Sequence, residues 1–107
     1  MNEELILGTE ALALVTINPV GKYTAYEFDF EIELYTKPSK KVVIPKKHCF
    51  PIEGDTSKSQ FYVPFNSADL GVGEVTLVVV EHIPDDFFPD GLRTEKVRIE
   101  SLATIIP

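Results

Sequence analysis

The clearest pattern in the chain is a strict alternation of apolar and acidic residues over residues 26–34. Every even position from Tyr26 to Leu34 is apolar, and every odd position carries Asp or Glu. Side chains along a β-strand point alternately to opposite faces, whereas a helix would spread these acids around its circumference. The pattern therefore predicts a strand with one buried face and one acidic, solvated face.

The longest predicted element is an antiparallel hairpin over residues 74–100. Residues 74–81 are rich in valine, residues 83–91 are rich in Pro, Asp and Gly, and residues 92–100 alternate again. Two extended runs around a turn-forming segment are typical of a hairpin, and its second arm continues over residues 101–107. The first arm carries apolar residues on both faces, so we expect both faces to be covered. One face holds Val75, Leu77 and Val79, and the other holds Val78 and Val80.

Shorter strands are predicted over residues 4–7, 11–17, 41–45 and 59–65, with a brief strand or loop over residues 46–52. Residues 4–7 are expected to form an edge strand. Pro45 ends its strand or confines it to an edge, and Pro64 places its strand at an edge or interrupts it there. Residues 66–73 predict one helical turn that connects two sheets, capped by Asn66 or Ser67 and closed by Gly71.

These elements define the predicted fold class, which is all-β. About seven to eight short strands, without an amphipathic helix longer than about two turns, predict an immunoglobulin-like antiparallel β-sandwich with a long final hairpin. Residues 1–107 form a single predicted domain. The chain contains one cysteine and no tryptophan, so it lacks the immunoglobulin disulfide and core Trp. The expected similarity is therefore architectural.

Composition narrows the classes of partner. With 107 residues, 44% hydrophobic and 25% charged, the chain suits one globular domain with a modest core. Its net charge of −7 argues against binding to nucleic acid and to anionic membranes, so we expect protein partners. The first residues lack a basic signal region and no apolar run approaches about 20 residues, which predicts a protein that is cytoplasmic as synthesised.

No catalytic, cofactor-binding or metal site is predicted. His48 and Cys49 are adjacent, but neighbours on a strand point to opposite faces, so Cys49 is expected to be a small core or rim residue. A zinc site that includes His82 would lack ligands at a standard spacing. Asp29, Glu31 and Glu33 resemble paired glycosidase carboxylates, yet no pocket is implied and a solvated strand face is expected.

The turn of the hairpin carries the candidate binding residues. An acidic tip of Glu81, Asp85, Asp86 and Asp90 could offer oxygen ligands to calcium, but the regular calcium-loop pattern is absent and a solvated turn is expected. Beside these acids, Phe87 and Phe88 are framed by two prolines. We expect one Phe to plug the open end of the core, and the other to anchor a partner. The predicted partner-binding residues are Asp85, Asp86, Phe87, Phe88 and Asp90.

A resemblance rests on residues 69–74 and 83–95 together with the alternating strand over residues 26–34. This combination resembles small prophage-encoded immunoglobulin-like β-sandwich proteins and is similar to the N-terminal domain of phage baseplate upper proteins. The resemblance implies a virion structural protein of the tail or baseplate, located in the virion and without enzymatic activity. It supplies no catalytic residue.

The sequence thus favours a non-enzymatic structural or interaction module whose partners are other virion components or a second copy. Residues 41–45 and the strand that contains Leu5 are expected to offer pairable edges. The alternative is a carbohydrate- or ligand-binding β-sandwich, which the lack of Trp and of an evident aromatic row makes less favoured. An enzyme ranks last.

Overall fold

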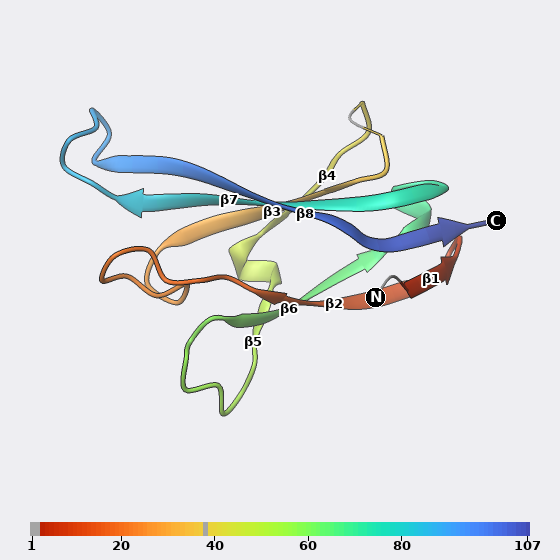
Figure 1. Ribbon diagram of the computed structural model, residues 1–107, viewed down its shortest axis with the longest axis horizontal. Helices are drawn as coiled ribbons and strands as arrows, with labels where there is room; N and C mark the ends of the chain where they lie inside the picture. The colour runs from red at the N-terminus through yellow and green to blue at the C-terminus, as the bar shows by residue number, and fades with distance from the viewer. Residues whose placement is uncertain (1–2, 38) are drawn as a thin grey trace.

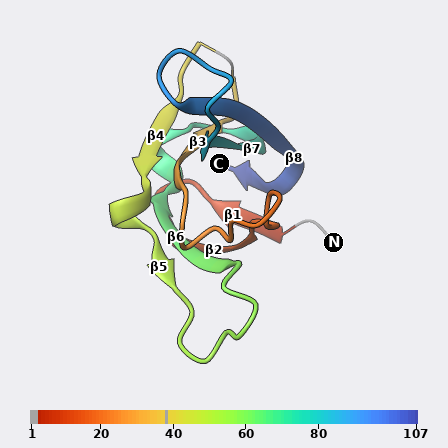
Figure 2. The ribbon, with the colours of Figure 1, turned by 90° about the vertical axis from the view of Figure 1, so that its left-hand side faces the viewer.

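The computed structural model describes residues 3–37 and 39–107, which form two β-sheets packed face to face (Figure 1). Figure 2 views the molecule from one end, so that the reader looks along the strands and sees the two sheets as two layers. The strands and the two short 3-10 turns are, in chain order, β1 (Glu3–Ile6), β2 (Glu10–Thr16), β3 (Asp29–Tyr35), β4 (Val42–Pro45), η1 (Lys46–His48), β5 (Phe50–Pro51), β6 (Gln60–Asn66), η2 (Ser67–Asp69), β7 (Gly73–Pro84) and β8 (Leu92–Ile106).

The predicted all-β sandwich is confirmed, with one difference in strand direction. One sheet has five strands in the order β1-β8-β7-β3-β4, and the other has three in the order β2-β6-β5. β1 is an edge strand, as expected, but it runs parallel to β8, from the pair Glu3–Ala103 to the pair Ile6–Ile106. The five-stranded sheet is therefore mixed, and the expectation of a wholly antiparallel fold is wrong at this edge. Hydrophobic periodicity identifies strands but carries no information about their relative direction.

The core lies between the two inner faces. Phe61 and Val63 of β6 and Val15 of β2 are buried against Ile32 and Leu34 of β3 and their neighbours on β7. Aromatic rings from both sheets meet at Phe61, which contacts Phe30 at 5.0 Å and Tyr26 at 5.4 Å between centroids, both edge to face. This geometry is favoured by the ring quadrupoles and adds to the burial of apolar area.

The long β7–β8 hairpin is confirmed. Its register runs from the pair Gly73–Ile105 to the pair Pro84–Leu92, with a bulge between Val75 and Leu77. The expected burial of both faces of β7 is also observed, since Val78 and Val80 are only 6% and 5% exposed. Long polar side chains on both neighbouring strands flank these valines on the outer face, with Arg98 and Glu33 paired to Val78. Their aliphatic stems shield the valines while the charged ends stay in water.

β3 begins later than the alternation predicts. The pattern starts at Tyr26, but residues 24–28 form a turn in which the backbone N–H groups of Glu27 and Phe28 donate to the Thr24 carbonyl, at 2.9 and 3.3 Å. The Glu27 carboxylate accepts hydrogen bonds from the backbone and hydroxyl of Thr24, and these bonds lower its pKa. A strand over residues 26–28 is therefore wrong, because local hydrogen bonding competes with the extended conformation.

Pro64 lies where the three-stranded sheet narrows. β6 is the central strand of that sheet, but β5 pairs with it only at Phe50–Tyr62 and Pro51–Phe61. Pro64 follows the end of this short ladder, so its missing N–H leaves no β5 carbonyl unpaired. The prediction that the strand lies at an edge or is interrupted at Pro64 is therefore wrong, because β6 is central and runs unbroken through Pro64, which is paired with Leu12 of β2.

The helical turn between the sheets is confirmed as η2. Asn66 is its cap, with Oδ1 accepting from the Ala68 N–H at 2.9 Å, and Gly71 follows with a φ of +84°. Ser67 has a different function: its hydroxyl accepts from the N–H groups of Gly8 and Thr9, at 2.8 and 2.9 Å, and donates to the Ile6 carbonyl at 3.2 Å. η2 therefore connects the sheets and also holds the β1–β2 turn.

Candidate functional site

The tip of the β7–β8 hairpin projects at one end of the molecule (Figure 1). Phe87 is 97% exposed and Phe88 is 43% exposed, so the expectation that one of them plugs the core is wrong. The turn explains this exposure, because the Asp85 carboxylate accepts a hydrogen bond from the Phe87 N–H at 3.0 Å and another from Arg93 Nε at 3.1 Å. The turn thus closes on its own polar groups and needs no buried aromatic anchor.

The predicted partner-binding residues share this tip. Asp86, Phe87, Phe88 and Asp90 are exposed, and Asp85 is half-buried beneath them. Glu81 is not part of this acidic group: it is buried on the inner face of the hairpin, directly opposite Glu95. Residues 3–37 and 39–107 contain no group of three or more His, Cys, Asp or Glu side chains able to hold a metal ion. Partner binding by the tip stays a prediction.

Cys49 is a core residue, as predicted. It is 5% exposed, and its Sγ donates to the Pro45 carbonyl at 3.6 Å. Burial disfavours the thiolate and raises the pKa of Cys49 to about 11. His48 is the last residue of η1 and is exposed, whereas Cys49 follows it and is buried, so the end of the 3-10 turn, and not the alternation of a strand, points the two side chains apart. A protonated thiol without a base is a poor nucleophile.

Two of the three carboxylates of β3 face basic side chains on the outer sheet face. Glu31 contacts Nε2 of His82 at 3.0 and 3.1 Å through its two oxygens, and Glu33 lies 3.4 Å from Lys41 Nζ. Asp29 is exposed. These carboxylates thus share only their sequence spacing with a glycosidase pair, because each Glu faces its own basic partner and the two do not line a shared hollow.

The outer face of the three-stranded sheet carries exposed apolar side chains that sequence analysis did not single out. We call this set the apolar face: Leu12, Leu14, Phe50, Tyr62 and Pro64. The exposed fractions are 62% for Leu12, 54% for Leu14, 57% for Phe50 and 41% for Tyr62. Strand pairing brings them together, since Leu12 is opposite Pro64, while Tyr62 is opposite both Leu14 and Phe50.

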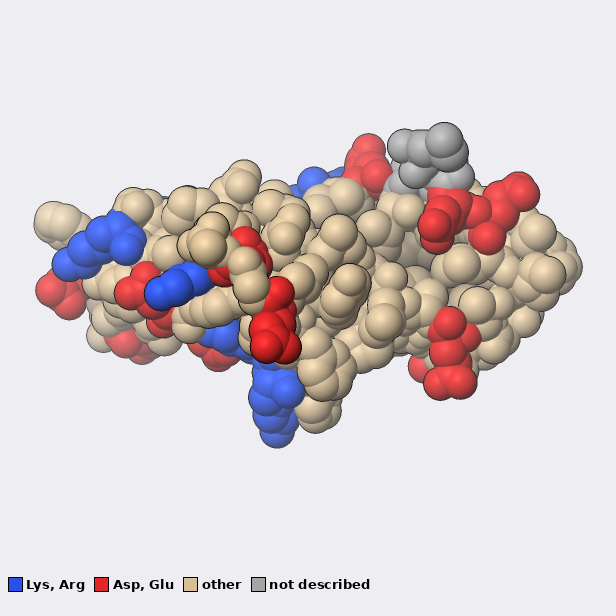
Figure 3. Space-filling view, turned by 90° about the horizontal axis from the view of Figure 1, so that it is seen from below, with Lys and Arg blue, Asp and Glu red and all other residues tan. Residues whose placement is uncertain are grey.

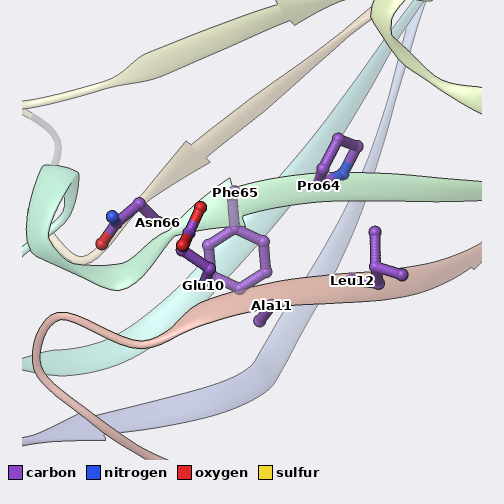
Figure 4. A pocket seen from close by; sticks show the side chains of 6 residues that line it. All are labelled: Glu10, Ala11, Leu12, Pro64, Phe65 and Asn66. Atoms are coloured by element: carbon purple, nitrogen blue, oxygen red, sulfur yellow. The ribbon is translucent and has the colours of Figure 1, made fainter.

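Figure 3 views this side of the molecule, where an uncharged area extends between charged groups. At one end of the apolar face, residues of β2 and β6 border an open hollow of about 620 Å³ (Figure 4). In that view Leu12 and Pro64 project to one side of the strands and Ala11 to the other. The hollow is lined by Glu10, Ala11, Leu12, Pro64, Phe65 and Asn66.

One signal in the sequence could have revealed the apolar face. In β2 the small residues Ala13 and Ala11 point inward while the larger Leu12 and Leu14 point outward, so the size order is the reverse of a usual half-buried strand. The alternation of Ala with Leu identifies two faces but does not say which one is buried. Ala13 and Val15 of β2 belong to the same buried cluster as Phe61 and the core residues of the other sheet, and this packing decides which face is buried.

Comparison with protein-family models, curated proteins and solved structures gives no match to this chain. Within residues 3–37 and 39–107, none of the helices has the length and apolar character needed to cross a bilayer.

Proposed function

We propose that this protein is a non-enzymatic structural and interaction module that binds through the apolar face. The observation that carries the proposal is the grouping of four exposed large hydrophobic side chains on one sheet face. Contiguous exposed apolar surface of this kind marks protein interaction sites.

The first partner we propose is a second copy of the chain, joined through β2, whose Leu12 and Leu14 form one edge of the apolar face. β2 is an edge strand, and Glu10 is its only charged residue. Natural edge strands are protected against pairing by charges, prolines or short length. β1 has two exposed Glu residues and β4 ends at Pro45, so both predicted edges are protected in ways that β2 is not.

The register of such a pair follows from the sequence of β2. An antiparallel pair centred on Ala13 would place Leu12 beside Leu14 of the second copy and Glu10 beside Thr16. No like charges would face each other, and the two apolar faces would become continuous. The same two-fold arrangement is the usual symmetry of protein dimers.

The test is the oligomeric state of matched edge variants. We expect wild-type protein to dimerise in sedimentation equilibrium and Leu14→Lys to be monomeric, because a charge replaces an interface leucine. Val43→Lys is the control, since Val43 is also an exposed edge-strand residue, at 56% against 54% for Leu14. A wild-type monomer at concentrations up to about 1 mM, or dissociation caused equally by Val43→Lys, would contradict the proposal.

We further propose that the module works in a phage-like tail or baseplate. Support for this setting comes from the resemblance carried by residues 69–74 and 83–95. The check is the genomic neighbourhood: genes for tail or capsid proteins beside this one would agree with the proposal, and glycan-utilisation genes would oppose it.

The apolar face also favours a second candidate function, carbohydrate binding. Phe50 and Tyr62 are adjacent exposed aromatic side chains on one flat sheet, and aromatic rings of this kind stack on sugars. A glycan array distinguishes the functions. Binding that disappears in Tyr62→Ala but persists in Phe88→Ala would favour a sugar on the sheet, and loss in Phe88→Ala alone would place it at the hairpin tip.

A further inference from the structure

A small cavity lies between the inner face of the β7–β8 hairpin and the segment that follows β2. Figure 1 shows this segment, in orange, below the hairpin. The cavity has a volume of about 130 Å³. Cavities of about 150 Å³ hold a molecule the size of benzene, so there is room for a short alkyl chain. Its apolar walls are formed by Ile17, Pro19, Val20, Val79, Val97 and Ile99.

Glu81 is one of four polar residues that line this cavity, and the others are Thr16, Asn18 and Glu95. It lines the cavity, is 3% exposed, and has an Oε1 atom without a hydrogen-bond partner among the described residues. A buried oxygen of this kind costs free energy comparable to a lost hydrogen bond unless a donor reaches it. Burial, followed by the charge of Glu95, raises the pKa of Glu81.

The charges around Glu81 favour a cation. Glu95 is directly opposite Glu81 and also lines the cavity. Arg93 is bonded to both Glu95 and Asp85, so this one guanidinium is shared by two other carboxylates. No salt bridge to Glu81 is present among the described residues. The site therefore has more negative than positive charge and an unpaired acceptor.

We propose that this cavity binds a primary alkylammonium group, with its alkyl chain along Val79, Val97 and Ile99 and its nitrogen at the Glu81 carboxylate. An ammonium has three donors, so it can satisfy Oε1 of Glu81 and also interact with Glu95. Calcium needs six to eight oxygen ligands, and residues 3–37 and 39–107 contain no group of three or more His, Cys, Asp or Glu side chains able to hold a metal ion. The ammonium belongs either to a free amine or to a lysine side chain of a peptide.

The experiment is an NMR titration of labelled full-length protein with n-butylammonium chloride, at neutral pH and constant ionic strength. We expect shifts of the Val79, Val97 and Ile99 methyl signals, and affinity at least about tenfold weaker in Glu81→Gln. Glu53→Gln, an exposed position with the same charge change, should bind like wild type. Nα-acetyl-lysine methylamide is the second ligand: its binding indicates a lysine side chain, whereas binding of butylammonium alone indicates a free amine.

Three results would overturn the proposal. These are the absence of methyl shifts with either ligand, equal binding by neutral 1-butanol, or unchanged affinity in Glu81→Gln. If Glu81→Gln does not fold, the second variant is Val97→Phe. Its larger side chain narrows the cavity and leaves Glu81 in place, and the fold should tolerate it because Val97 is 46% exposed. Undiminished binding by that variant would equally contradict the site.

Discussion

Lys46 shows how burial changes the role of a residue that the sequence places in a short basic run. Its Nζ donates to the carbonyl oxygens of Tyr26 and Phe28, at 3.0 and 2.8 Å, and lies 5.6 Å from the centroid of the Phe30 ring. Burial lowers the pKa of Lys46, while the charge of Asp29 opposes this effect. The ammonium thus satisfies carbonyl groups of the turn that precedes β3.

We predict that Lys46→Ala lowers the free energy of unfolding by about 1–3 kcal/mol, because it removes two hydrogen bonds from a charged donor. Lys47→Ala is the matched control: Lys47 is exposed, and its change should stay within about 0.5 kcal/mol. Urea unfolding followed by circular dichroism measures both. Equal values for the two variants would show that the Lys46 contacts contribute nothing to stability.

The buried Glu81 should make the free energy of unfolding depend on pH. Burial raises its pKa above the ordinary value of 4.5, so the folded protein keeps this proton at pH values where the unfolded chain has lost it. The stabilisation is complete below pH 4.5 and is lost as the pH rises through the raised pKa. The other titratable group lining the cavity is Glu95, which is held by Arg93.

We therefore expect Glu81→Gln to lose less stability than wild type between pH 4 and pH 8, since glutamine has no proton to release in this range. The measurement is the free energy of urea unfolding at a series of pH values. Glu53→Gln controls for the change in net charge. Parallel curves for Glu81→Gln and wild type would contradict a raised pKa in the folded state.

At the scale of elements, the sequence predicts what depends on local pattern and misses what depends on distant contacts. The β7–β8 hairpin and η2 were predictable because valine-rich arms, turn residues, Asn66 and Gly71 act locally. The start of β3 was missed because the turn over residues 24–28, closed by its own hydrogen bonds, also receives two donors from Lys46, 18 to 20 positions away. The parallel β1–β8 pair joins the two ends of the described chain, and no local pattern encodes it.

The same holds for the candidate sites: features set by local sequence could be predicted, and features set by distant contacts could not. Exposure of the acidic tip residues was readable from Pro, Asp and Gly in the turn. The outward orientation of Leu12 and Leu14 was not, because it depends on which side of β2 the core aromatics occupy. The burial of Glu81 was also missed, since it follows from cross-strand placement opposite Glu95 and from the loop that covers it.

A substitution of Ser67 tests how much the hydrogen bonds between η2 and the β1–β2 turn stabilise the fold. The Ser67 hydroxyl is fully buried and bonds the β1–β2 turn through Ile6, Gly8 and Thr9. We expect Ser67→Ala to cost about 2 kcal/mol, because two N–H groups lose their acceptor. Thermal unfolding measures the loss, with Ser39→Ala, at an exposed position, as the control. A neutral Ser67→Ala would mean that water replaces the hydroxyl at no cost.

At the scale of the whole molecule, the hairpin tip is separate from the core. Phe87 is almost fully exposed and adds little to packing, so Phe87→Ala should change the free energy of unfolding by less than about 0.5 kcal/mol. Leu77→Ala, which empties a fully buried position, should cost about 2–5 kcal/mol. Chemical denaturation measures both. A large loss in Phe87→Ala would show that the tip packs against the molecule.

The parallel pairing of β1 with β8 has a mechanical consequence. Four consecutive residue pairs connect these strands, from Glu3 with Ala103 to Ile6 with Ile106. Tension applied between Glu3 and Ile106 would pull the two strands in opposite senses along their own axes. The interstrand bonds would then carry the load together, in shear, and would not open one after another. A domain built in this way resists being drawn apart by its ends.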